Sequence, residues 1–226
     1  MTPPSDATVR ELPGAVLRTA SVSEQDNRSY LLTSTATGAQ LLVDAADDAV
    51  ALLALVAAGS GGSGSGGTGG GAGRLDLVVT THQHWDHHRA LVAVVEATGA
   101  STAAGAEDAA ALPAPTDRLL VHGDRLEVGD LALDVVHLRG HTPGSVALAW
   151  TDGGGTVHLF TGDSLFPGGV GNTQQDPERF TSLLDDVEQR LFAVYPDSAV
   201  VHPGHGDGTT LGAERPQLDT WRARGW

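Results

Sequence analysis

The segment Thr80–His88 concentrates histidines and one aspartate at the spacing of a metal-binding motif. It reads Thr-Thr-His-Gln-His-Trp-Asp-His-His and continues the apolar stretch Leu75–Thr80. At the end of a strand, residues two apart project to the same side, so two imidazoles can converge on one ion while later residues reach a second point nearby. Imidazoles and a carboxylate bind borderline divalent metals. The candidate ligands in this motif are His82, His84, Asp86 and His87.

Three later segments offer further ligands, which are needed because one motif cannot fill the coordination spheres of two ions. Each follows a predicted strand and contains Gly or Pro that can hold a tight turn. The segments are Gly140–Gly144, Gly162–Phe166 and His202–Gly206, with His141, Asp163 and His205 as candidates. A single strand-end histidine is more often structural, and a solvated His-rich turn is the alternative for the motif. The four segments together, in this order, favour a metal centre.

Composition excludes several kinds of chemistry. The 226 residues include 13 Lys+Arg, all of them Arg, against 28 Asp+Glu, which gives a formal charge of −15, and there is no Cys. Schiff-base lysines, cysteine nucleophiles, disulfides and Cys-bound metals are therefore impossible. The negative charge argues against nucleic acid and anionic membranes as partners. We expect a small-molecule substrate, and the oligomeric state stays open.

The tetrad Gly162–Leu165 also spells Gly-Asp-Ser-Leu, a signature of one class of serine esterases, which would make Ser164 a nucleophile. That class carries its serine near the N-terminus and an Asp-x-x-His near the C-terminus, and this sequence has neither. It also lacks a Gly-x-Ser-x-Gly nucleophile elbow. Metal chemistry is therefore favoured over serine chemistry.

The predicted elements alternate between strands and helices in two halves, which favours helices packed outside a two-sheet core. Strands are predicted at Ala15–Val22, Ser29–Thr33, Gln40–Asp44, Leu75–Thr80, Arg118–Val121, Arg125–Val128, Leu131–Leu138, Ser145–Trp150, Thr156–Thr161 and Ala199–His202. The first three are expected to be antiparallel. Helices are predicted at Ala49–Ala58, Ala90–Ala97, after the N-cap Asp176, and within Glu214–Trp226.

A single domain over residues 1–226 is expected, interrupted by a glycine-rich insertion. In Gly59–Gly73, 10 of 15 residues are Gly and most others are Ser or Thr, a composition typical of a flexible segment. The first 14 residues do not resemble a secretory signal, and no stretch approaches 18 apolar residues. A cytoplasmic location is therefore predicted.

With these residues in place, the sequence resembles the metallo-β-lactamase-fold hydrolases, and among them the glyoxalase II-like (hydroxyacylglutathione hydrolase-like) branch. The resemblance extends from about Asn27 to Gly206. It rests on Thr81–His87, Gly140–Gly144, Thr161–Phe166 with Gly168, Gly169 and Gly171, and Pro203–Gly206. It implies an α+β fold, a four-layer αββα sandwich of two mixed β-sheets flanked by helices, with metals at one edge between the sheets.

The resemblance also implies a ligand for each position of a binuclear site. The first metal is expected on His82, His84 and His141, the second on Asp86, His87 and His205, with Asp163 bridging both. Zinc is the expected metal, and iron or manganese are alternatives because such ligand sets accept all three.

The implied reaction is hydrolysis of an ester or thioester. Two divalent ions about 3.5–4 Å apart share a water whose pKa falls toward 7, and the metal-bridging hydroxide attacks the carbonyl. Asp86 is also the candidate catalytic residue, expected to handle a proton. Asp44 is a candidate carboxylate that orients a ligand histidine from outside the metal sphere.

Several interpretations stay open. The leading alternative is a mononuclear iron persulfide dioxygenase-like oxidoreductase, whose usual Arg-Thr-Asp after the bridging-type aspartate is replaced here by Gly171–Gln174. A non-catalytic metal-binding module is a further alternative. Glutathione as part of the substrate also stays open, because about 20 residues follow His205 where glyoxalase II carries a helical domain. The remaining histidines are predicted non-ligands, His88 and His202 flanking the site and His122, His137 and His158 structural.

Overall fold

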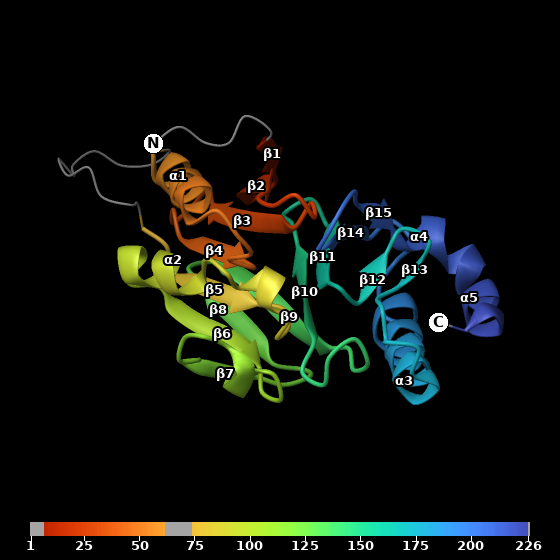
Figure 1. The fold of residues 1–226 in the computed structure, drawn as a ribbon. Helices are drawn as coiled ribbons and strands as arrows, with labels where there is room; N and C mark the ends of the chain where they lie inside the picture. The colour runs from red at the N-terminus through yellow and green to blue at the C-terminus, as the bar shows by residue number, and fades with distance from the viewer. Residues whose placement is uncertain (1–6, 62–73, 226) are drawn as a thin grey trace.

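Two β-sheets packed face to face form the centre of the molecule, with helices on their outer faces (Figure 1). The computed structural model describes residues 7–61 and 74–225. The first sheet has the strand order β1-β2-β3-β4-β5-β6-β7, and the second has the order β15-β14-β11-β10-β9-β8. A separate hairpin pairs β12 with β13. The predicted α+β sandwich of two mixed sheets is therefore confirmed.

The first sheet changes from antiparallel to parallel pairing along its width. Strands β1 to β4 are antiparallel neighbours, as expected, whereas β4 to β7 run parallel. Parallel neighbours need crossover connections, which α1 and α2 provide. The elements are β1 (Thr8–Leu12), β2 (Ala15–Ser21), β3 (Arg28–Ser34), β4 (Gln40–Val43), α1 (Ala49–Ser60), β5 (Leu77–Thr80), η1 (Trp85–His87), α2 (Leu91–Thr98), β6 (Ser101–Gly105), η2 (Ala109–Ala111) and β7 (Arg118–Leu120).

The second sheet is antiparallel except for the parallel pair β11 and β14. Because the carboxyl ends of these two strands meet at one edge, the loops that follow them are neighbours. The elements are β8 (Arg125–Val128), β9 (Leu131–His137), β10 (Val146–Thr151), β11 (Val157–Gly162), β12 (Leu165–Phe166), β13 (Gly169–Val170), α3 (Pro177–Val187), η3 (Glu188–Phe192), β14 (Val200–Pro203), β15 (Thr209–Thr210), α4 (Leu211–Glu214), η4 (Arg215–Gln217) and α5 (Leu218–Arg224).

Three apolar clusters hold the four layers together. Between the sheets, Leu41 and Leu148 are among the fully buried side chains. On the outer face of the first sheet, Leu42 packs in a cluster with residues of α1 and α2. On the outer face of the second, Leu159 packs with residues of α3 and with Trp221 of α5. Both sheets are covered on both faces, which is why many strands are nearly continuous apolar runs rather than alternating ones.

The helix signals in the sequence match the structure closely. The Asp176 side chain accepts hydrogen bonds from the backbone N–H groups of Glu178 and Arg179 at the start of α3, with Pro177 in the first turn. The predicted C-terminal helix is divided into α4, η4 and α5, and Trp221 anchors α5 in the core at 2% exposure. Trp226, the last residue of that predicted segment, lies outside the described residues.

The chain enters and leaves the glycine-rich segment at nearly one point. Gly59 and Ser60 belong to α1, so the insertion begins two residues later than predicted, and residues 62–73 lie outside the described residues. The backbone N–H of Arg74 donates to Ser60 Oγ at 3.0 Å, and the Gln40 side chain donates to the same oxygen at 2.9 Å. These bonds join both ends of the segment to the first sheet.

Five strands were not predicted, and their composition or their length explains why. Strand β1 is formed by antiparallel pairing with β2. Because its side chains are largely exposed, it contains no apolar run. Strand β6 is made of small residues, because a Cβ at Gly105 would overlap the Gly144 carbonyl. Strands β12, β13 and β15 have two residues each, too few for a periodic pattern. None of the helices in residues 7–61 and 74–225 has the length and apolar character to cross a membrane.

Truncating the inter-sheet core should destabilise the protein much more than truncating an exposed strand residue. Leu148 is 0% exposed, so Leu148→Ala removes buried methyl groups and leaves a cavity, and we expect a loss of about 2–5 kcal/mol in unfolding free energy. Leu119 on β7 is 57% exposed, so Leu119→Ala should cost less than about 1 kcal/mol. Urea denaturation of both variants measures this, and equal losses would contradict the assigned core.

Candidate metal centre

The seven candidate ligands converge at one edge of the sandwich, although they come from four separate parts of the chain. His82 and His84 follow β5, His141 lies between β9 and β10, Asp163 follows β11 and His205 follows β14. Asp86 and His87 belong to the single turn η1. The edge is therefore built from loops at strand ends, as the sequence predicts.

The first group of nitrogen atoms is formed by three histidines. His82 Nε2 lies 3.1 Å from His84 Nδ1 and 3.2 Å from His141 Nε2. Ligand atoms of these three residues all lie within 4.8 Å of one another. Burial lowers the pKa of each of the three rings, so they are neutral and present lone pairs, as metal ligands must.

The second group combines two histidines with a carboxylate. His87 Nε2 lies 3.2 Å from His205 Nε2, and Asp86 Oδ2 lies 3.3 Å from the same His205 atom. These ligand atoms again lie within 4.8 Å of one another. A carboxylate in only one of the two groups makes them chemically different, the first purely imidazole and the second mixed.

Asp163 lies between the two groups and contacts both. Its Oδ1 is 3.3 Å from His87 Nε2, and its Oδ2 is 3.5 Å from His205 Nε2 and 3.6 Å from His141 Nε2. Oδ1 is buried and accepts no hydrogen bond within residues 7–61 and 74–225. A buried carboxylate oxygen without a hydrogen bond, surrounded by imidazole nitrogens, fits one or two divalent cations.

Electrostatic interactions within the second group favour charge on its rings when no cation is bound. Burial opposes protonation of His87, but Asp163 and Asp44 outweigh it and raise the pKa of His87 to about 10. Interaction with Asp163 likewise raises the pKa of His205. Burial opposes ionisation of Asp163, yet His205 and His87 hold its pKa well below the usual range. In the absence of a cation, protons on His87 and His205 therefore balance the negative charge of the carboxylates, as a metal cation would.

The outer nitrogen of several rings is held by a partner, which fixes the direction of the inner one. His87 Nδ1 lies 2.9 Å from Asp44 Oδ2, so the predicted contact between Asp44 and a candidate ligand histidine is confirmed. His141 Nδ1 lies 2.8 Å from the Asn172 carbonyl, and His205 Nδ1 lies 2.9 Å from the Gln25 carbonyl. Each ring is therefore oriented independently of any ion.

Asp44 also ties the motif to the sheet. Its backbone adopts φ 58°, a left-handed conformation that aspartate tolerates better than most residues. The carboxylate accepts hydrogen bonds from the backbone N–H and the hydroxyl of Thr81, at 2.7 and 2.8 Å. The residue that orients His87 therefore also fixes the start of the loop that carries His82.

Two buried residues that support the centre were not predicted. Asp108 accepts hydrogen bonds from the backbone N–H groups of Gln83 and Gly144 and from the Thr142 hydroxyl, so it joins the loops that carry three candidate ligands. Asn27 donates to Asp86 Oδ2 at 3.0 Å. Both are fully buried, but each lies in an unremarkable polar turn, so only the tertiary structure reveals its role.

Glycines allow the loops to approach the centre closely. A Cβ on Gly204 would overlap Asp163 Oδ1 and His87 Cε1, and a Cβ on Gly171 would overlap the Asp163 carbonyl oxygen. These are the positions where only glycine fits without moving a candidate ligand. The Gly-rich segments found in the sequence therefore serve close approach around Asp163.

The residues predicted to be non-ligands lie outside both groups. His88 Nε2 lies 3.1 Å from the Gln83 carbonyl, His137 Nε2 lies 2.7 Å from the Pro143 carbonyl, and His122 is exposed. His158 and His202 contact each other at 3.1 Å. Ser164 is buried, and its Oγ has no hydrogen-bond partner in the described part of the chain, so no base is in place to activate it.

A cavity of about 510 Å³ adjoins the first group of histidines. It is lined by His84 and His141, by Gln83, Gly140, Thr142 and Pro143, and by Arg139, Gln174, Arg179 and Ser182. Arg179 donates to the carbonyl oxygens of Gly140 and His141, and Arg139 pairs with Asp186. The cavity therefore has polar walls whose arginines already have partners.

The αββα sandwich makes this an α+β protein, and the His- and Asp-rich loops at one edge place it in a metal-binding class. The chain belongs to the metallo-beta-lactamase superfamily, whose family model matches residues 29–205.

Individual relatives share most of this chain. A protein of Jannaschia sp. named hydroxyacylglutathione hydrolase is 34% identical over 184 residues, covering 80% of this chain and 62% of its own length. The chain thus spans less than two thirds of this relative. The structure of ETHE1 from Myxococcus xanthus has a TM-score of 0.73 at 28% identity, covering 88% of this chain and 81% of that one. The structure of TTHA1623, described as di-iron-bound, has a TM-score of 0.67 at 31% identity, covering 87% and 96%.

Metal binding to His87 should release protons, because this ring is protonated at neutral pH in the metal-free protein. We expect release of at least about one proton at pH 7.5 and an apparent metal affinity that rises with pH. In the metal-free protein, this raised pKa contributes stability that is present below about pH 6.5 and is lost as the pH rises toward 10. Zinc titration calorimetry in buffers of different ionisation enthalpy measures the proton release.

Asp44→Asn is the variant for this prediction, because it removes one of the groups that raise the pKa of His87. We expect fewer protons released and a metal affinity lowered by about 10–100-fold. The matched control is Asp134→Asn on β9, an exposed residue that pairs with Arg125 and belongs to neither group of candidate ligands. Proton release that is unchanged in Asp44→Asn would contradict the assigned role of this contact.

Proposed function

We propose that this chain is a binuclear metal-dependent hydrolase that cleaves an ester or thioester bond of a small molecule. The observation that carries this proposal is the buried Asp163 carboxylate, which contacts His87 and His205 on one side and His141 on the other. A carboxylate shared between two nitrogen-rich groups is the arrangement expected of a bridging ligand. The relative from Jannaschia sp. named hydroxyacylglutathione hydrolase supports the thioester class.

Each residue has a defined role in this proposal. His82, His84 and His141 would hold the first ion, Asp86, His87 and His205 would hold the second, and Asp163 would be the ligand shared by both. When bound, divalent ions acidify a coordinated water to a pKa of about 7 and polarise the carbonyl under attack. Zinc is the proposed metal, with iron or manganese as alternatives, and the di-iron-bound TTHA1623 makes iron the first alternative to test.

Asp86 is the proposed catalytic residue among the ligands. Burial favours its neutral form, but the hydrogen bond from Asn27 and the nearby His87 outweigh burial and lower the pKa of the Asp86 carboxyl. It therefore stays ionised, and its Oδ2 is fixed by Asn27 Nδ2 at 3.0 Å. An oriented, ionised carboxylate of this kind positions the attacking water and accepts its hydrogen bond.

The substrate is proposed to lie in the cavity of about 510 Å³ beside His84 and His141. Its volume is within the range of small-molecule sites. Because the arginines on its wall already have partners and Gln174 Oε1 accepts from Arg179, the polar groups left for a substrate are the Gln83 amide, Gln174 Nε2 and the Ser182 hydroxyl. The cytoplasmic location stays a prediction.

Metal content separates this proposal from its alternatives before a substrate is known. Protein purified without added metal or an affinity tag should contain about two zinc ions per chain, read by elemental mass spectrometry. His84→Asn should lower that content and hydrolysis of a thioester panel, whereas His137→Asn, a histidine outside both groups, should change neither. About one iron per chain and no hydrolysis would instead favour the persulfide dioxygenase-like oxidoreductase. Metal without any turnover would favour a binding module.

Asp86→Asn should separate metal binding from proton handling. The amide keeps one oxygen for the metal and the contact with Asn27, but it removes the negative charge, so we expect kcat to fall by about 100-fold or more. Ser164→Ala should leave turnover unchanged, since no base is in contact with that hydroxyl. Elemental analysis and steady-state kinetics check both variants, and full turnover with intact metal in Asp86→Asn would disprove the catalytic role.

A further inference from the structure

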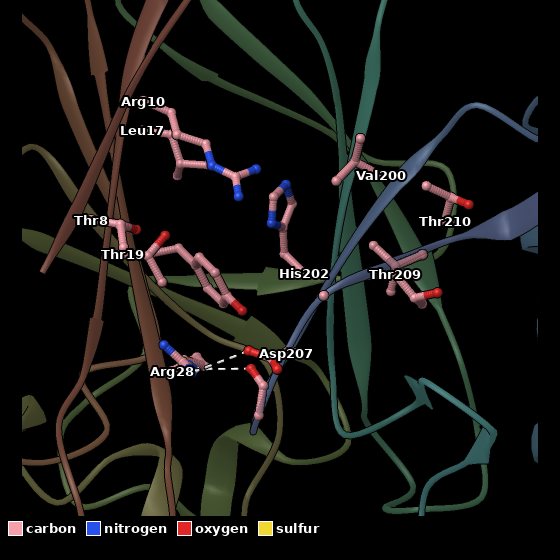
Figure 2. Close-up of a pocket in the computed structure, with 14 residues that line it drawn as sticks. Thr8, Arg10, Leu17, Thr19, Arg28, Val200, His202, Asp207, Thr209 and Thr210 are labelled. Atoms are coloured by element: carbon pink, nitrogen blue, oxygen red, sulfur yellow. Dashed lines mark hydrogen bonds and ion pairs between the residues drawn. The ribbon is translucent and has the colours of Figure 1, made fainter. Parts of the chain in front are cut away.

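A second cavity, of about 450 Å³, opens between the N-terminal strands of the first sheet and β14–β15 of the second (Figure 2). Arg10, Thr19 and Arg28 line one wall, and His202 and Thr209 line the other. None of the seven candidate metal ligands is among its lining residues. Its volume is within the usual range of small-molecule sites, so the cavity can hold a small ligand.

Two arginines line this cavity, although the chain carries a formal charge of −15. One aspartate, Asp207, also lines it. Arg28 is already engaged, because its guanidinium pairs with Asp26 at 3.2 Å and lies 3.8 Å from Asp207. Within the described residues, the Arg10 guanidinium forms no hydrogen bond or ion pair, and it extends toward His202 (Figure 2). Arg10 is therefore the free cation of the cavity.

His202 presents a hydrogen-bond acceptor to the same cavity. The side chain is 7% exposed, and its ring stacks on Phe160 with centroids 4.9 Å apart. Its Nε2 lies 3.1 Å from His158 Nδ1, while His158 Nε2 faces Asp152 Oδ2 at 3.6 Å. The negative charge of the Asp152 carboxylate favours the His158 proton on Nε2, although 3.6 Å is longer than a hydrogen bond, and we therefore assign His158 Nδ1 as the acceptor of His202 Nε2–H. His202 Nδ1 is then left with a lone pair.

The acceptor character of His202 Nδ1 does not change near neutral pH. Burial, followed by the nearby His158 and Arg10, lowers the pKa of His202 to about 3. Nδ1 forms no hydrogen bond with the part of the chain that the structure describes. A lone pair on the wall of a cavity favours a ligand with a hydrogen-bond donor, and a bare carboxylate oxygen placed against it would be repelled.

We propose that this cavity binds a small hydroxycarboxylate monoanion, with its carboxylate on Arg10 and its hydroxyl donating to His202 Nδ1. Guanidinium and carboxylate form paired, charge-assisted hydrogen bonds, which accounts for the charge of the ligand. The Arg10 guanidinium, which has no ion-pair partner in the described residues, matches one negative charge. Leu17 and Val200 supply apolar surface for a hydrocarbon part. The contacts from Asp152 to His158 and from His158 to His202 leave a lone pair on His202 Nδ1, which favours a ligand with a hydroxyl donor.

The test compares mandelate with phenylacetate, which differs only in lacking the hydroxyl, by calorimetric titration of the metal-loaded protein. Mandelate should bind at least about fivefold more tightly than phenylacetate, the worth of one hydrogen bond. Arg10→Gln should weaken mandelate binding by about tenfold or more, since it removes a charge-assisted pair. Arg118→Gln, an arginine on β7 that does not line the cavity, is the matched control and should change nothing.

Three results would overturn the proposal. If Arg10→Gln leaves the affinity for mandelate unchanged, mandelate binds at the metal centre and not in this cavity. If mandelate and phenylacetate bind with equal affinity, His202 does not select for the hydroxyl. If mandelate does not bind below about 10 mM, the cavity does not bind this class of ligand. Crystals of the unmodified protein soaked with 4-bromomandelate give a readout that needs no variant. An anomalous bromine peak beside His202 and Leu17 is expected, and a peak only at the metal centre would disprove the site.

Discussion

Burying the Asp163 carboxylate is the physical constraint on which the rest of the structure depends. An ionised carboxylate without compensating charge is costly in a protein interior, so its neighbours must supply positive charge. Four loops meet around it, and two glycines let them come close enough. Asp44, Asn27 and Asp108 then hold the surrounding side chains. The same carboxylate can be balanced by protonated histidines or by metal ions, and these two states exclude each other.

The sandwich tolerates this charged centre because apolar packing on both faces of the two sheets, and not the loops at the edge, stabilises the fold. Both sheets are buried on both faces by three separate apolar clusters. The loops at one edge are therefore free to carry polar and charged side chains that contribute little to the core. Parallel pairing of β11 with β14 brings Asp163 and His205 to the same edge, although 42 residues separate them in the sequence.

Much of the centre could be predicted from the sequence because its residues carry distinctive chemistry at fixed spacing. The motif from His82 to His87 and the glycine-flanked His141, Asp163 and His205 are recognisable without a structure. Asn27 and Asp108 are not, because a single buried polar residue has no pattern, and its partners are set only by folding. The same limit explains β1 and β6: exposed and small side chains leave no periodic signal, and pairing with neighbouring strands decides their conformation.

The hydrogen bond between Ser60 and Arg74 has a consequence for how this protein can change over time. The chain departs from the first sheet and returns to it at almost the same place, so the span between is closed by the fold itself. Closure entropy grows only slowly with loop length, so residues can be gained or lost there at small thermodynamic cost. Sequence drift, engineered insertions and new chain termini are all best tolerated at such a junction, far from the residues that selection must keep.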